Sequence, residues 1–197
     1  MFEFDFKLLR MANELKGEND RAAAIVGTSV LETRLEELLT KIMISHKEVP
    51  NIFKGYAPLS TFSAKIRLSY FLGLIPEDIY KDLDRIREVR NRFAHELNPL
   101  SFEDQSTADI VKSLNCVQPF IKVFRRVNKD DLAEVAESED TYKMSEHNEE
   151  PRNLWNLAVS VLATELNALA HSYGKAVSPK NRLDFEVKLA SDTERRA

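Results

Sequence analysis

The sequence has little glycine, with five residues among 197, and few segments in which β-branched and polar residues alternate. A protein built from sheets needs turn residues between short strands and an apolar–polar alternation along each strand. Because both signals are rare here, we expect an all-α fold. A single helical-bundle domain of about six to eight helices would accommodate a chain of this length.

A single cysteine, Cys116, excludes an internal disulfide and a cysteine-based metal site. The sequence also lacks a glycine-rich phosphate-binding loop, cysteine and histidine residues at the spacing of zinc ligands, and the serine, histidine and acid motifs of a hydrolase. We therefore expect no cofactor and no metal, and we favour no catalytic residues. No helix-turn-helix motif is present either, so we do not expect the protein to recognise a DNA sequence directly.

Long apolar runs are missing as well, and none approaches the length that a membrane-spanning helix requires. The N-terminal residues are interrupted by acids, unlike a signal peptide. We expect a cytoplasmic protein with no membrane contact. The net charge of −4 and the isoelectric point of about 5.7 argue against a general nucleic-acid binder, although they allow a local basic pocket.

Two consecutive helices, over residues 60–75 and 77–97, hold the most informative pattern, and the other segments read as helices that pack against this pair. Ser60 or Thr61 can cap the first helix, and Gly73 with Pro76 separates it from the second. The apolar stripe of the second helix is interrupted once, by Arg90. Its positions are Ile79, Leu83, Ile86, Arg90, Phe93 and Leu97.

Arg90 has no acidic neighbour three or four residues away on its own helix, so it needs a partner elsewhere. A helix capped by Asn19 or Asp20 and running to about Ser45 offers Glu32, beside its stripe of Ala24, Thr28, Leu31, Leu35, Leu38 and Ile42. Two interpretations stand. The stem of Arg90 packs on apolar neighbours while its guanidinium reaches a facing acid such as Glu32 or the solvent, or the guanidinium holds a phosphate or another anion. Glu32 can equally be a solvated surface acid.

The rest of the chain divides by composition. Residues 1–127 form the expected core, beginning with a short amphipathic helix over 2–15. A helix opened by Ser101 and Asp104 is expected to run to about 127 and to kink or split at Pro119. Residues 128–150 are acidic and poor in apolar side chains, which predicts a linker. Residues 151–174 predict a helix that packs back on the core, and 175–197 a tail.

One stretch resembles a known family. The resemblance is carried by Ala57–Ile75, then by Tyr80, Asp82, Leu83, Ile86, Arg87, Val89, Arg90, Asn91, Phe93, Ala94 and His95, and by Ser101, Phe102 and Asp104. This text resembles the MltR family of mannitol operon repressors, which are all-helical and carry no recognisable DNA-binding module. The arginine-to-histidine spacing also resembles the broader HEPN group, some of whose members are metal-independent ribonucleases.

The resemblance implies a regulatory protein, a homodimer that acts on sugar-alcohol uptake by binding a protein or a small effector. Glu32, Arg90, Asn91 and His95 would form its polar cluster. The alternative is a HEPN-type ribonuclease in which His95 exchanges protons, Arg90 stabilises the phosphorane and Asn91 orients either group. Residues 90 and 95 lie about 140° apart around a helix, so this alternative needs either a helix that loosens at His95 or a dimer interface that brings two copies together. RNA would be a substrate only under this alternative.

Overall fold

The structure is a computed structural model that describes residues 19–122 and 149–173. Every regular element in these ranges is helical, which confirms the all-α prediction. The elements are α2 (Asp20–Ile42), η1 (Val49–Phe53), α3 (Phe62–Phe71), α4 (Glu77–His95), α5 (Gln105–Lys112), η2 (Asn115–Val117) and α8 (Pro151–Ser172). The expected helix over 2–15, nearly all of the 128–150 linker and the 175–197 tail lie outside the described residues.

Helix α2 begins where the sequence predicts. The side chain of Asn19 accepts a hydrogen bond from the Ala22 amide at 2.9 Å, which satisfies one of the free donors of the first turn. The helix ends at Ile42, three residues before the predicted end at Ser45. The predicted stripe is buried except for Ile42, which is partly exposed.

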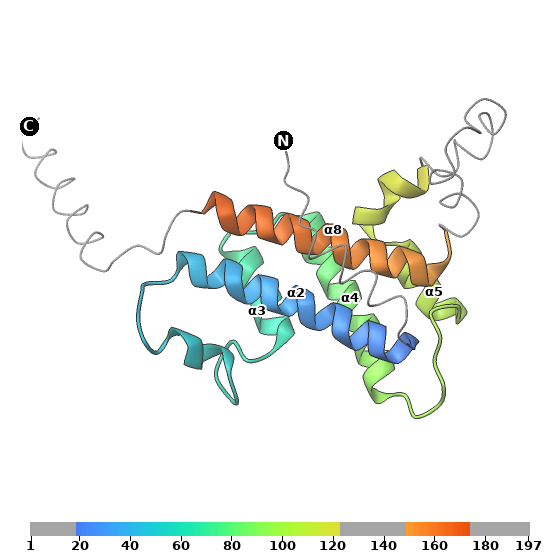
Figure 1. Ribbon diagram of the computed structural model, residues 1–197, viewed down its shortest axis with the longest axis horizontal. Coiled ribbons are helices and arrows are strands. Elements are labelled where there is room, and N and C mark those ends of the chain that lie inside the picture. Colours follow the sequence, from blue (N-terminus) through green and yellow to red (C-terminus); the bar gives the residue numbers. More distant parts are fainter. Residues whose placement is uncertain (1–18, 123–148, 174–197) are drawn as a thin grey trace, which may run out of the picture.

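Helices α2 and α4 share the centre of the fold. Helix α4 contacts α2, α3, α5 and η2, as expected for the helix pair that dominates the sequence pattern, whereas α8 packs most extensively along α2. Figure 1 shows α8 lying alongside α2 in front of α3 and α4. Gly27 allows the close approach, since a Cβ there would lie 3.0 Å from Val159 Cγ2 and 3.2 Å from Trp155 Nε1.

Three aromatic rings pack against one another between α4, α8 and the loop that follows α4. Phe93 of α4, Phe102 of the following loop and Trp155 of α8 are fully buried, with ring centroids 4.8 Å and 5.2 Å apart in that order. The indole N–H of Trp155 donates to the Ala23 carbonyl at 3.3 Å. The buried rings supply a large apolar area, and this bond satisfies the one polar atom among them.

The break between α3 and α4 follows the prediction. Thr61 caps α3 by accepting from the Ala64 amide at 3.2 Å. Gly73 has φ of +68°, a conformation that favours glycine, and Pro76 is the N-cap of α4. The far end differs, because α4 ends at His95 and Leu97, placed in the buried stripe by periodicity, is 99% exposed.

The expected helix over 104–127 is divided, and not at Pro119. Helix α5 ends at Lys112 and is followed by η2, while residues 118–122 are helical again, so that Pro119 lies in a first turn where it is tolerated. The predicted pair of Ser101 and Asp104 lies at the start of α5. Ser101 donates its amide to Asp104 Oδ2 at 2.7 Å, and the helix begins only after Asp104.

Candidate functional site

A pocket of about 320 Å³ lies where α2, α3 and α4 meet. Helix α4 contributes two arginines and an asparagine, α2 contributes one acid, and the start of α3 contributes hydroxyl groups and one aromatic ring. The lining residues are Glu32, Ser60, Thr61, Phe62, Ser63, Arg87, Arg90 and Asn91. Three of the four residues of the predicted polar cluster therefore share one pocket.

Arg90 is half-buried, as its position in the apolar stripe of α4 predicts. Its NH1 donates to the side-chain oxygen of the adjacent Asn91 at 3.0 Å. Among the described residues, no carboxylate lies within ion-pair distance of its guanidinium. The interpretation that Arg90 is paired with Glu32 is therefore wrong for this structure, although both residues line the pocket.

Glu32 is bound by a different cation, Lys65 of α3. The Lys65 ammonium lies 2.8 Å from Glu32 Oε1 and 3.2 Å from Glu36 Oε2, and it lies 5.8 Å from the centroid of the Phe53 ring. Only 3% of Lys65 is exposed. Burial of an ammonium group is costly unless acids face it, and two carboxylates do so here.

Lys65 is a residue that the sequence reasoning missed, although a signal for it exists. Position 65 is three residues after Phe62 and four before Ser69, and both of these face the core. A lysine at such a position needs an acidic partner. Glu32 and Glu36 stand one turn apart on α2 and supply it, which leaves Arg90 unpaired by either.

His95, the fourth predicted residue, is not part of this pocket. It is the last residue of α4, it is exposed, and it is absent from the pocket lining. The structure thus brings Arg90 and Asn91 together with Glu32 but leaves His95 apart within one chain. If the four residues only held the helices together, His95 would be buried with the others, and it is exposed.

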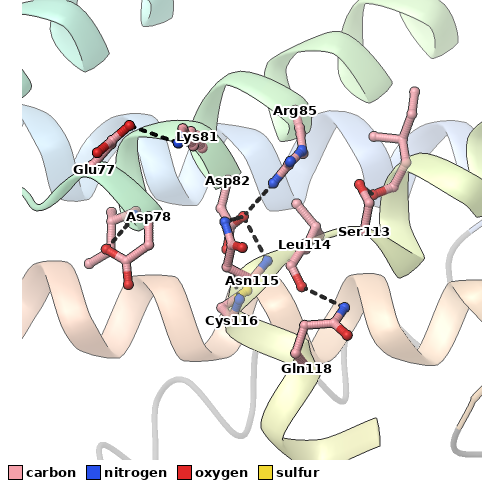
Figure 2. A network of polar contacts seen from close by, with 12 residues as sticks. Glu77, Asp78, Lys81, Asp82, Arg85, Ser113, Leu114, Asn115, Cys116 and Gln118 are labelled. Carbon is pink, nitrogen blue, oxygen red and sulfur yellow. Dashed lines mark hydrogen bonds and ion pairs between the residues drawn. The ribbon is translucent and has the colours of Figure 1, made fainter.

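A second polar cluster surrounds Asp82, which lies three residues before Arg85 on α4. Asp82 is buried, with 1% exposed, and it accepts from the backbone amides of Asn115 and Cys116, both at 2.8 Å (Figure 2). The Asn115 side chain donates at 2.9 Å and Arg85 NH1 at 3.2 Å. The carboxylate therefore fixes the start of η2, which explains why the chain turns there and not at Pro119.

Cys116 has no features of a nucleophile. Burial raises the pKa of its thiol well above the usual range, and the nearby Asp82 carboxylate raises it further through its charge and a hydrogen bond. A thiol of this kind stays protonated, and thiolate is the reactive form. Cys116 is thus a packing residue, partly buried against the core.

In the described ranges, no three histidine, cysteine, aspartate or glutamate side chains are placed to hold a metal ion together. None of the helices there has the length and apolar character needed to cross a membrane.

Comparison with known proteins identifies the family. The family model MtlR, described as mannitol repressor, matches residues 16–167. The chain belongs to the mannitol repressor family. The match covers the described residues from the start of α2 to Asn167 in α8, and it confirms the family that residues 57–104 resemble.

A solved structure supports the fold of this mannitol repressor family member. One chain of the X-ray structure of the MtlR–HPr complex from Escherichia coli aligns with a TM-score of 0.60 and 21% sequence identity. The alignment covers 84% of this chain and 99% of that one. A search of curated proteins finds no match.

Proposed function

We propose that this protein regulates a mannitol operon by binding a protein partner of the HPr type, without reading DNA sequence itself. The observation that carries the proposal is family membership over residues 16–167, together with a similar fold in a chain solved in complex with HPr. The net charge of −4 fits this role, because sequence-independent DNA affinity comes from neutralising phosphates with basic residues.

A surface suited to a protein partner lies at the end of α3. Phe71 and Leu72 are neighbours and are 76% and 50% exposed. Behind them Tyr70 stacks on Tyr80 with ring centroids 4.4 Å apart, and Tyr70 also contacts Phe71 at 5.8 Å. Aromatic side chains on a rigid base are typical of the centre of protein interfaces. We place the HPr-type partner on this corner between α3 and α4.

The experiment is titration calorimetry of purified HPr into the full chain, with Phe71→Asp as the test variant. We expect saturable binding that weakens at least about tenfold in Phe71→Asp, as truncation of an aromatic anchor typically does. Leu97→Asp is the matched control, because Leu97 is also an exposed apolar residue but follows α4 at its other end. Its binding should equal that of the wild type.

A cellular measurement completes the test. A reporter driven by the mannitol operon promoter should rise when the gene is deleted and return to its repressed level with the wild-type gene but not with Phe71→Asp. Absence of HPr binding combined with an unchanged reporter would overturn the proposal.

The homodimer is a separate part of the proposal. Light scattering coupled to size exclusion should give about twice the chain mass of 22.6 kDa. If Phe71→Asp halves this mass, the corner between α3 and α4 is the contact between two copies and not the HPr site. A monomeric wild type removes the homodimer from the proposal and leaves the partner-binding part unaffected.

A further inference from the structure

The pocket between α2, α3 and α4 carries unlike groups on its two walls. The α4 wall holds the cations Arg87 and Arg90, while the α2 wall holds the carboxylate of Glu32. Hydroxyl groups from the segment Ser60–Ser63 also line the pocket, and α4 adds the amide of Asn91. Such a lining distinguishes a ligand with one anionic end and one hydroxyl-bearing end from a ligand that is only anionic.

Arg90 is the group that points to an anion. A guanidinium has five N–H donors, and within the described ranges Arg90 uses one of them, in the bond to Asn91. No carboxylate in the described residues neutralises its charge, whereas Arg87 beside it pairs with Asp84 at 2.8 Å. A half-buried arginine with free donors matches the planar, two-point geometry of a phosphate or carboxylate.

Glu32 indicates what the rest of the ligand must be. Its carboxylate already binds the buried Lys65 at 2.8 Å, an ammonium group that it shares with Glu36, and it still lines the pocket. A second anion placed against Glu32 would be repelled, but a hydroxyl group could donate to it. Inorganic phosphate alone would therefore use the α4 wall and leave the α2 wall without a partner.

We propose that this pocket binds a phosphorylated sugar alcohol, an acyclic polyol with a single phosphate. The phosphate accepts from Arg90, with Arg87 adding charge, and the polyol hydroxyls reach Asn91, the Ser60–Ser63 hydroxyls and Glu32. The volume of about 320 Å³ is at the lower end for small-molecule sites, which suits such a ligand better than a nucleotide. The choice of a polyol rests on the proposed role in a mannitol operon.

The test is calorimetric titration of the full chain with mannitol 1-phosphate, inorganic phosphate and mannitol at low ionic strength. We expect mannitol 1-phosphate to bind at least about tenfold more tightly than either of the others, since each of these lacks one end. Arg90→Gln should weaken mannitol 1-phosphate at least about tenfold, which reflects loss of the charged, two-point contact. Glu32→Gln should weaken it more than it weakens inorganic phosphate.

Arg92→Gln is the matched control, because Arg92 is on the same helix and pairs with Glu88 at 3.1 Å without lining the pocket. Its affinity should be unchanged, and circular dichroism should show the wild-type helix content in every variant. Equal affinity for inorganic phosphate would reduce the site to an anion site and overturn the polyol assignment. Unchanged affinity in Arg90→Gln, or no binding of mannitol 1-phosphate, would overturn the site itself.

This test and the test of partner binding fail separately. HPr binding that depends on Phe71, with no binding of mannitol 1-phosphate, would contradict the ligand proposal and support the proposed regulatory function. Binding of mannitol 1-phosphate that depends on Arg90, with no HPr binding, would support the ligand site and contradict the proposed protein partner.

Discussion

The ammonium group of Lys65 lies 2.8 Å from the carboxylate of Glu32, and this contact determines the character of the pocket. Glu32 is engaged from the side of α3, so the guanidinium of Arg90 on α4 keeps its charge facing the pocket without a carboxylate partner in the described residues. A buried structural ion pair and an available cation thus lie next to each other on different helices.

Replacing Lys65 should test the structural part of this arrangement. Lys65→Met removes the cation shared by Glu32 and Glu36 and leaves two like charges close together. We expect a loss of about 2 kcal/mol in the free energy of unfolding, less than for fully buried partners because both carboxylates reach water. Urea denaturation followed by circular dichroism measures this loss, and the double variant Lys65→Met with Glu32→Gln should recover part of it.

Lys81→Met, which breaks the exposed pair with Glu77, is the control and should change the midpoint of urea denaturation little. Equal effects of Lys65→Met and Lys81→Met would contradict the prediction.

Asp82 is buried and should contribute far more to the stability of the fold than an exposed acid on the same helix such as Asp84. Asp82→Asn replaces one acceptor oxygen with a donor and leaves amide groups of Asn115 or Cys116 without a full partner. The expected loss is about 2 kcal/mol in the free energy of unfolding, because unsatisfied buried donors carry their whole desolvation cost. Asp84→Asn, which changes an acid 51% exposed two residues away, should stay within about 0.5 kcal/mol of the wild type. The idea that Asp82 anchors η2 fails if both variants unfold at the same urea concentration.

Gly27 should not tolerate the usual helix-stabilising change. Alanine normally gains up to about 1 kcal/mol over glycine inside a helix. At Gly27 the new Cβ would approach Val159 and the fully buried Trp155, whose indole cannot move without losing its bond to Ala23. We expect Gly27→Ala to lower stability by about 1 to 2 kcal/mol through overpacking between α2 and α8. Thermal unfolding measures it, and a raised midpoint would show that the two helices separate at little cost.

The sequence predicts the elements of this fold better than their packing. Caps are local, so residue type and spacing narrow each one to two neighbouring candidates, of which the structure uses Asn19 and Thr61. The burial of Asp82 and the pairing of Lys65 depend on residues more than thirty positions away, and periodicity along one helix contains no information about them. For the same reason the sequence could not show that Glu32 binds Lys65, although Glu32 and Arg90 line one pocket.

Leu97 shows the corresponding limit at a helix end. A periodic pattern continues through any apolar residue that happens to follow, and only the backbone shows that α4 has already ended at His95.

The position of His95 leads to the last prediction, which concerns RNA. A metal-independent ribonuclease would need His95 and Arg90 at one phosphate, yet His95 is exposed at the end of α4 and does not line the Arg90 pocket. Five residues along a helix turn the two side chains about 140° apart, so one chain cannot aim both at the same group. We expect purified protein in EDTA to leave mixed single-stranded RNA intact, as should Arg90→Ala and His95→Ala. Cleavage by the wild type that disappears in both variants would mean that two copies complete a site, and the ribonuclease would then replace the regulator. Cleavage that persists in both variants would be a contaminant and would leave the prediction standing.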